Sequence, residues 1–250
     1  MPRYDFRTTR LYVSAPLAQG GEVTLDRDQA NYLTNVLRLG IGDPVLLFNG
    51  TDGEWQANLA KGGKRSATLV VGMQQRAQTP AGNLHFLFAP LKHARLDYLV
   101  QKAVEMGATL LQPVMTRHTQ VARVNLDRMR ANAIEAAEQC GILQVPEVAE
   151  PVAFEQVTAG SDRVLVFCDE DAEVRDPVAA LVAARREFHQ PLSVLVGPEG
   201  GFAEEERTAL LKRTMVVRIA LGPRILRADT AAIAALALVQ AVLGDWQGPS

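Results

Sequence analysis

Apolar and polar residues alternate in two different ways along the chain, and the change falls between residues 74 and 83. Before it, short apolar runs are separated by turn residues, and one helical pattern, from Arg27 to Leu37, follows a potential N-cap side chain at Asp26. Strands are expected at 10–13, 22–25, 44–48, 55–59 and 66–71. Residues 1–75 therefore predict a small, mostly β domain with one helix.

After the polar segment 74–83, which we interpret as a linker, apolar runs of strand length alternate with helical patterns. We expect strands at 84–89, 110–115, 163–167, 192–196 and 215–220. We expect helices at 96–106, 126–139, 177–186, 204–211 and 229–243. This alternation is typical of α/β proteins, so residues 84–250 predict a second domain with a mostly parallel sheet and helices on both faces.

Two glycine-bearing loops follow the last two expected strands, and each leads into a helix. They are Val196-Gly197-Pro198-Glu199-Gly200-Gly201-Phe202 and Leu221-Gly222-Pro223-Arg224-Ile225-Leu226-Arg227-Ala228-Asp229-Thr230. Parallel strands end at the same edge of a sheet, and open α/β folds bind their ligands there. The two loops therefore predict one shared pocket.

The residues of these loops limit the class of ligand that the pocket could bind. Neither loop has a phosphate-binding fingerprint. The apolar pair Ile225-Leu226 in an otherwise polar loop suits a purine ring or a sulfonium-bearing cofactor better than a bare phosphate. Asp229 stands where the last helix would begin, so it can be a helix cap, a catalytic carboxylate or both.

The amino-acid composition of the chain mainly serves to exclude several classes of function. The chain has 250 residues, a net charge of −2 and a pI near 6.1, so binding of nucleic acid would need a local basic patch. Cys140 and Cys168 lack metal-ligand spacing, the histidines are scattered, and no Gly-x-Ser-x-Gly motif is present, so we expect neither a metal site nor a hydrolase. We expect a cytoplasmic protein, because no apolar run approaches the ~18 residues of a membrane span.

Several basic residues would form a phosphate-binding track if the fold brought them to one surface; otherwise they are solvated charges. Lys61, Lys64 and Arg65 fall at the edge of an expected hairpin, and Arg95 adds positive charge near Lys92. The candidates are Arg10, Arg38, Lys61, Lys64, Arg65 and Lys92.

The two loops taken together resemble the signature of a known family. Gly-Pro-Glu-Gly-Gly-Phe at 197–202 and Leu-Gly-Pro-Arg-Ile-Leu-Arg-Ala-Asp-Thr-Ala at 221–231 are similar to motifs of the bacterial small-subunit rRNA methyltransferase E family, in the SPOUT class of knotted methyltransferases. The likeness covers nearly the whole chain: 101–107 and 135–141 resemble two helix segments of the family, and 35–39, 42–43 and 48–50 resemble its small PUA-like β domain.

The resemblance implies an enzyme that transfers the methyl group of S-adenosylmethionine to N3 of one uridine in the decoding region of 16S rRNA. It also implies a homodimer and a carboxy-terminal chain threaded into a trefoil knot. In that picture the cofactor would be held by Phe167, Val196, Gly197, Glu199, Gly201, Leu221, Gly222, Ile225 and Leu226. We hypothesise that Arg227 stabilises charge on the uracil, while Asp229 or Glu199 orients the base or accepts its proton.

The sequence departs from the family pattern at two positions. Ile142 follows Gly141 where the family usually has arginine, and Asp229 stands where the family has glutamate. Two other functions stay open. One is a knotted enzyme that methylates another RNA, such as a tRNA ribose 2′-oxygen, and the other is a non-catalytic RNA-binding assembly factor.

Overall fold

The computed structural model describes residues 7–63, 66–159, 162–188 and 190–247, so Lys64 and Arg65 lie outside the described residues. The chain forms two compact units. The first contains residues 1–80 and 137–145, and the second contains residues 81–136 and 146–250. The sequence predicted one boundary between two domains, whereas here the segment 137–145 returns to the first unit.

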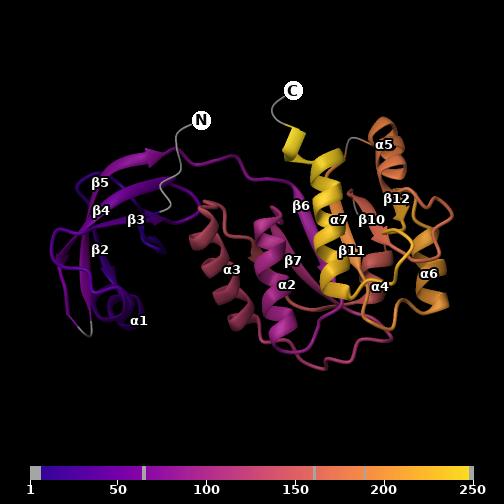
Figure 1. Cartoon of the computed structure of the whole chain (residues 1–250), viewed down its shortest axis with the longest axis horizontal. Coiled ribbons are helices and arrows are strands. Elements are labelled where there is room, and N and C mark those ends of the chain that lie inside the picture. The colour runs from indigo at the N-terminus through magenta and orange to yellow at the C-terminus, as the bar shows by residue number, and fades with distance from the viewer. Residues whose placement is uncertain (1–6, 64–65, 160–161, 189, 248–250) are drawn as a thin grey trace. The chain divides into compact units, whose positions relative to one another are not determined.

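The first unit is a five-stranded mixed sheet with one interrupted helix (Figure 1). The strands occur in the order β1-β3-β4-β5-β2; β1 and β3 are parallel, and the other neighbours are antiparallel. The strands are β1 (Arg10–Tyr12), β2 (Glu22–Leu25), β3 (Pro44–Phe48), β4 (Glu54–Lys61) and β5 (Ala67–Arg76). The small β domain expected from the sequence is therefore present.

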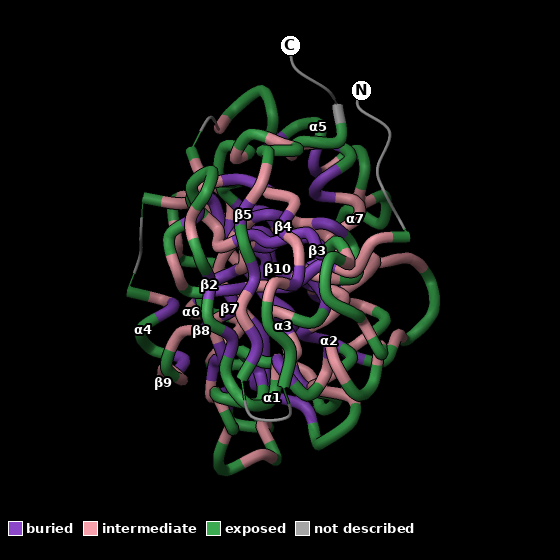
Figure 2. The backbone as a smooth tube through the Cα atoms, turned by 90° about the vertical axis from the view of Figure 1, so that its left-hand side faces the viewer, coloured by how far each residue is buried: buried purple, intermediate pink, exposed green. Residues whose placement is uncertain are grey.

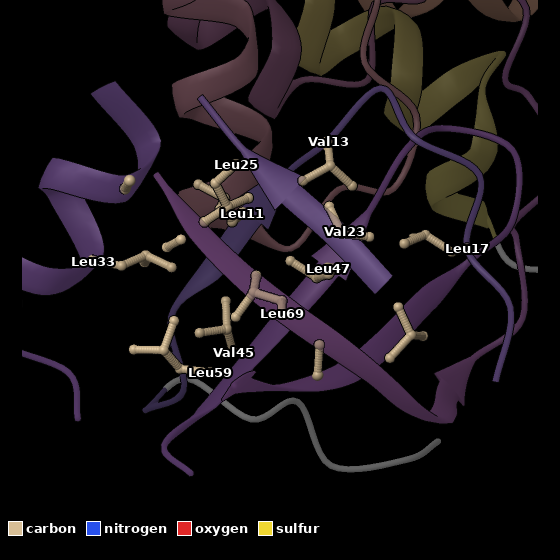
Figure 3. Close-up of a cluster of buried hydrophobic side chains, with 14 residues drawn as sticks. Leu11, Val13, Leu17, Val23, Leu25, Leu33, Val45, Leu47, Leu59 and Leu69 are labelled. Atoms are coloured by element: carbon tan, nitrogen blue, oxygen red, sulfur yellow. The ribbon is translucent and has the colours of Figure 1, made fainter. Parts of the chain in front are cut away.

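The core of this unit lies where the helix covers the sheet. Leu33 projects from the helix toward strand side chains such as Leu47 and Leu69, and all three are fully buried (Figure 3). The strand residues that reach this core alternate with exposed ones, as β2 does with its exposed Glu22 and buried Val23. Burial of these aliphatic side chains is the main force that holds the unit together.

The sequence predicted a single α-helix in the first unit, but the structure has an α-helix that continues as a π-helix. It starts as α1 (Arg27–Asn31), with Asp26 Oδ1 accepting the Gln29 N–H at 2.8 Å, and continues as the π-helix η1 (Tyr32–Val36). The wider turn ends with the Leu37 N–H donating to the Tyr32 carbonyl at 2.9 Å. Such π-turns arise where the chain must fit one extra residue into a helix, and they cluster at functional sites.

Strand β5 also extends farther than expected, through residues that we had assigned to a linker. Its last residue, Arg76, donates to the buried carboxylate of Glu54 through Nε at 2.9 Å and Nη2 at 2.7 Å. Arg76 also donates to the carbonyl of Gly141, and the Tyr12 N–H donates to Glu138. These contacts bind the segment 137–145 to the first unit.

The second unit is built on a parallel sheet with the strand order β12-β10-β11-β6-β7-β8, and β9 pairs with β7 (Figure 1). All of the paired neighbours in this sheet are parallel. The strands are β6 (Leu84–Phe88), β7 (Leu110–Met115), β8 (Glu147–Val148), β9 (Val152–Ala153), β10 (Val164–Cys168), β11 (Leu192–Val196) and β12 (Val216–Ile219). The α/β class predicted from the sequence is confirmed.

Helices cover both faces of this sheet. On one face, α4 and α6 pack against side chains of β10 and β11, including Leu165, Phe167 and Leu195. On the other, α7 packs against β11 and contacts α2 and α5. The helices are α2 (Ala94–Glu105), α3 (Leu126–Cys140), α4 (Phe154–Thr158), α5 (Pro177–Glu187), α6 (Glu204–Leu211), α7 (Ala228–Val242) and the 3₁₀ turn η2 (Asp245–Gln247). Buried residues concentrate in strands such as β10, and exposed ones in the connecting loops (Figure 2).

Four short elements of the second unit were not expected from the sequence. These are β8, β9, α4 and η2, which span only two to five residues each. A two-residue strand cannot show alternation, and a single helical turn cannot show a repeating face, so the apolar pattern carries no signal for them.

Candidate functional site

A pocket of about 290 Å³ opens at the carboxyl ends of β10 and β11 in the second unit. Because parallel strands end together, it lies at the edge of the sheet where the sequence predicted a ligand site. Its walls come from the end of β10, from both glycine loops and from the start of α7, at residues 168–170, 196–202, 221–222, 224–226, 228 and 231.

The first glycine loop needs its glycines because the aromatic core lies directly beneath it. A Cβ at Gly197 would come within 2.9 Å of the ring of Phe202, which packs edge-to-face on Phe167 with ring centroids 5.7 Å apart. Gly201 has φ 68°, in the left-handed region that other residues rarely adopt. His118 Nδ1 lies 3.1 Å from the carbonyls of Gly200 and Gly201 and donates to them, since carbonyl oxygens only accept.

The expected cofactor-binding residues gather at this pocket, with one exception. Phe167 is fully buried and packs in the core beneath the first loop, so it does not line the pocket. The three residues that follow it, 168–170, line the pocket instead. The expected residues that line it are Val196, Gly197, Glu199, Gly201, Leu221, Gly222, Ile225 and Leu226.

Arg95, on the first turn of α2, joins the two carboxylates that the sequence marked as candidates. Its Nε and Nη2 donate to Asp229 at 3.2 Å and 3.0 Å, and its Nη1 donates to Glu199 at 2.6 Å. Glu199 belongs to the first glycine loop, and Asp229 to the first turn of α7. The arginine therefore links the two loops to a third element, α2.

Hydrogen bonding from Arg95 holds the pKa of Asp229 below its ordinary value, and the Thr230 N–H adds to this effect. A carboxyl with a lowered pKa is a weak base, so the pair is suited to positioning rather than to proton abstraction. Asp229 is not the N-cap: Arg227 occupies that position, and the Asp229 carboxylate accepts the N–H of the adjacent Thr230 at 3.0 Å rather than an N–H farther along the helix. Its charge also suits the first turn of a helix.

The two remaining cations of the second loop differ in position. Arg224 lines the pocket, whereas Arg227 stands just beyond its lining residues with an exposed side chain. Neither forms an ion pair with another residue that the structure describes. Ile225 is 98% exposed at the pocket rim, so its apolar surface is open to a ligand or partner.

A buried carboxylate fixes the wall formed by residues 168–170. Asp169 is 3% exposed and accepts from Arg218 Nε at 2.7 Å, while Arg207 Nε lies 3.3 Å from the same oxygen. Arg207 also donates to Asp171 at 2.6 Å. Because guanidinium groups surround this carboxylate, the chain at the end of β10 is held in one position.

Cys168 lines the pocket as a neutral thiol. Burial raises its pKa to about 12, with a smaller contribution from the charge of Asp169. A thiol with a raised pKa is a poor nucleophile near neutral pH. Among the residues that the structure describes, no cluster of three or more His, Cys, Asp or Glu side chains is arranged to hold a metal ion.

The expected RNA-binding residues lie in different environments. Arg38 and Lys61 are exposed in the first unit, and Lys92 is exposed in the second. Arg10 is buried instead: Nε donates to Glu54 at 2.9 Å, and the two side chains are 5% and 3% exposed. Arg10 is thus committed to an interior ion pair and cannot reach a phosphate.

In the described part of the chain, none of the helices has the length and apolar character needed to cross a bilayer.

Arg95 is the site residue that sequence reasoning missed. It was noted only as extra charge beside Lys92, because its partner Asp229 is 134 residues away in the chain. The only signal in the sequence was its position in the first turn after a strand. Arg95 follows β6 and Glu199 follows β11, and the sequence does not show that these two strands are neighbours.

Family models match both units. Residues 77–240 match the model of an RNA methyltransferase domain, and residues 25–72 match that of an RNA methyltransferase PUA domain. Ribosomal RNA small subunit methyltransferase E of Rickettsia conorii is 30% identical over 232 residues, which cover 92% of this chain and 94% of that protein. The Bacillus subtilis protein of the same name is 25% identical, with 96% of each chain covered.

Solved structures show the same relationship. Ribosomal RNA small subunit methyltransferase E from Neisseria gonorrhoeae, bound to S-adenosyl methionine, superposes with a TM-score of 0.85 at 27% identity, covering 96% of this chain and all of that one. A putative methyltransferase from Legionella pneumophila in complex with the same cofactor gives 0.77 at 26% identity, covering 94% and 98%. The chain therefore belongs to the ribosomal RNA small subunit methyltransferase E family.

Proposed function

We propose that this protein transfers the methyl group of S-adenosylmethionine to N3 of a uridine in the 16S rRNA of the small ribosomal subunit. One observation carries this proposal: the two glycine loops form a pocket at the sheet edge, and Arg95 joins them through Glu199 and Asp229. The names of the relatives and the cofactor bound in the Neisseria gonorrhoeae structure support it.

The residues of the pocket fit this cofactor. Of its carboxylates, Asp169 and Glu199 are paired with arginines, whereas Glu170 is 68% exposed and suits a ligand that carries positive sulfonium and ammonium groups. Leu221 and Leu226 provide apolar surface for an adenine ring. The exposed backbone of the glycine loops offers N–H and C=O groups to the polar edges of the ligand, because no side chains cover them there.

The bound sulfonium supplies an activated methyl group, so the protein needs no covalent catalysis. What the protein contributes is alignment of uridine N3 with that methyl group and stabilisation of the uracil as N3 loses its proton. Arg227 is placed for the second task, because its guanidinium is exposed next to the pocket and forms no ion pair with a described residue.

Asp229 acts through Arg95 in this proposal. Its lowered pKa makes it a poor base, and two hydrogen bonds fix it to the guanidinium. Arg95 and Asp229 are thus positioning residues that set the distance between the first glycine loop and the start of α7. Glu199, whose side chain is 43% exposed, completes the bridge on the side of the pocket.

The first unit would hold the RNA outside the reacting nucleotide. Arg38 and Lys61 offer exposed positive charge there, and Lys64 and Arg65 follow in the sequence, outside the described residues. Phosphate contacts of this kind orient an RNA without reading its sequence. A homodimer, a trefoil knot in the carboxy-terminal chain and action in the cytoplasm, where ribosomal RNA is found, complete the proposal.

Calorimetry and an in vitro methylation assay test this function together. The purified protein is titrated with S-adenosylmethionine, then incubated with labelled cofactor and small ribosomal subunits from a strain that lacks its gene. We expect saturable cofactor binding and 3-methyluridine in the 16S rRNA. Failure to bind the cofactor would point to a non-catalytic assembly factor. Binding with a different methylated nucleoside, such as a 2′-O-methylribose in tRNA, would assign another RNA.

A further inference from the structure

A second pocket of about 440 Å³ lies in the second unit, between the loop after β6 and the loop after β7. Its volume falls within the ~300–1,000 Å³ range of ligand pockets. Leu91 and Met129, each 1% exposed, and Leu96 provide its apolar surface. None of its lining residues belongs to the pocket between the glycine loops.

Positive charge is in excess at this second pocket. Lys92, Arg123 and Arg128 line it, against a single carboxylate, that of Asp97. Arg128 holds both oxygens of Asp97, with Nε–Oδ1 at 2.9 Å and Nη2–Oδ2 at 2.6 Å, so these two charges offset each other. Lys92 and Arg123 are exposed and form no ion pair with another described residue. Two unpaired cations above an apolar surface suit a phosphate that carries a base or a ribose.

The backbone at the edge of the pocket is strained. His93 has φ 43° and ψ −121°, in the left-handed half of the Ramachandran map, and its exposed side chain lines the pocket. It is the second residue of a turn closed by the Arg95 N–H and the Lys92 carbonyl at 3.2 Å, a position where glycine is favoured. Side chains kept in strained conformations cluster at binding sites.

The second pocket adjoins the first through shared elements. Its β6 loop begins at Ala89, whose N–H donates at 3.0 Å to Val196, the residue that starts the first glycine loop. The same loop leads to Arg95, which binds Glu199 and Asp229. Its β7 loop contains His118, which donates to Gly200 and Gly201. A strand whose target base reaches the first pocket would therefore pass the second.

We propose that the second pocket binds a nucleotide of the substrate RNA that neighbours the target uridine, with Lys92 and Arg123 on its phosphate and the apolar surface against its base or ribose. The inference rests on the proposed function, because it takes RNA as the substrate. It adds a subsite made entirely of the second unit, so RNA recognition is not confined to the first.

The double variant Lys92→Ala/Arg123→Ala tests this subsite, and Arg130→Ala is its control. Arg130 is an exposed cation on the same helix as Arg128, it pairs with Asp127, and it does not line the pocket. Initial rates are measured with unmodified 16S rRNA transcript and with small subunits from a deletion strain, over a range of KCl concentrations. Cofactor affinity is measured separately by calorimetry.

We expect the KM for RNA to rise at least about tenfold in the double variant, the equivalent of one lost charge-assisted hydrogen bond. The salt dependence of log KM should weaken by about 0.7, because both cations contact the same phosphate. The kcat at saturating RNA and the Kd for S-adenosylmethionine should match those of Arg130→Ala. His93→Gly, in which glycine suits the turn, should also raise the KM without loss of thermal stability.

A double variant with the KM and salt slope of Arg130→Ala would overturn the subsite. So would a change in sedimentation from dimer to monomer with an unchanged salt slope, because the pocket would then hold a second copy of the chain. If the wild type methylates neither RNA, the proposed function fails independently. Filter binding of the same RNAs then decides the subsite alone, with the same expected change in salt slope.

Discussion

The guanidinium of Arg95 holds the carboxylate of Asp229 with two hydrogen bonds, Nε–Oδ2 at 3.2 Å and Nη2–Oδ1 at 3.0 Å. This contact joins the first turn of α2 to the first turn of α7. The aspartate side chain is long enough to bring both carboxylate oxygens within hydrogen-bonding distance of this guanidinium. Because of this contact, we expect the Asp229 carboxylate to position Arg95 rather than to act as a base.

Removing either partner should slow methyl transfer with little effect on cofactor binding. We expect Arg95→Ala and Asp229→Asn each to lower kcat by about 100-fold, since misplacement by about 1 Å has effects of that size. The Kd for S-adenosylmethionine should change by less than about threefold, which is under 1 kcal/mol. The double variant should be no slower than the worse single variant. Lys102→Ala, which breaks the Lys102–Glu105 pair elsewhere on α2, is the matched control.

Additive losses in the double variant would contradict this account, because they would mean that Arg95 and Asp229 act separately. A bell-shaped pH profile of kcat that vanishes in Asp229→Asn would also contradict it. In that case Asp229 would be titrating as a catalytic base despite its pairing with Arg95.

The same pair predicts a pH dependence of stability. Arg95 lowers the pKa of Asp229 in the folded protein. Such a carboxyl contributes stability that is fully present above its unfolded pKa of about 3.9 and is lost as the pH falls through its folded pKa. We expect the difference in unfolding free energy between wild type and Arg95→Ala to be level from about pH 8 to about pH 5 and to shrink below about pH 4. Urea unfolding across this range measures it, and a difference that grows in acid would refute it.

A buried ion-pair network predicts the most sensitive position of the first unit. Glu54 is 2% exposed and accepts hydrogen bonds from both Arg10 and Arg76. Glu54→Gln would leave the buried Arg10 guanidinium without a countercharge, so we expect a loss of about 3–5 kcal/mol in unfolding free energy. Urea unfolding followed by the fluorescence of Trp55 measures the change. Glu22→Gln, exposed on β2, should stay within about 0.5 kcal/mol of wild type.

The close packing under the first glycine loop makes Gly197 intolerant of a side chain. In Gly197→Ala, the new methyl would overlap the Phe202 ring, which is itself held by Phe167 and Phe154. Overpacking of this kind costs about 1–3 kcal/mol. We expect the loop to shift and the Kd for S-adenosylmethionine to rise at least about tenfold. Gly222→Ala has no atom within 4 Å of its Cβ but is strained by its φ of 90°, so it separates steric overlap from backbone strain. Equal Kd values in the two variants would contradict the packing argument.

The apolar pattern predicted best the elements whose ends are marked in the sequence. The strand 192–196 and the helix 204–211 have the bounds expected from the sequence, because an apolar run broken only by Ser193 and an acidic first turn delimit them. The π-turn of η1 was not predictable, since α- and π-helices share the same apolar face over five residues. The residues that line the first pocket were largely predictable because glycine loops at parallel strand ends converge by topology.

Contacts between side chains that lie far apart in the sequence could not be predicted from the sequence. Arg10 looked like a surface cation, yet it is buried on β1 and forms an ion pair with Glu54. Phe167 was expected at the pocket wall, but the side chains of β10 alternate, and Phe167 points to the face covered by α4 and α6. The only local signal for Arg95 was its position in the first turn after a strand, and its partner Asp229 is 134 residues away. Each depends on which elements become neighbours in the fold, and a pattern of apolar residues does not encode this.

Nucleoside mass spectrometry of 16S rRNA tests the central claim most directly. RNA is compared from the wild-type strain, a strain without this gene, and deletion strains that carry either the wild-type gene or the Arg227→Ala variant. We predict that 3-methyluridine disappears from 16S rRNA in the deletion strain, returns with the wild-type gene and stays absent with Arg227→Ala, although that protein still binds S-adenosylmethionine. Full retention of 3-methyluridine in the deletion strain would contradict the account.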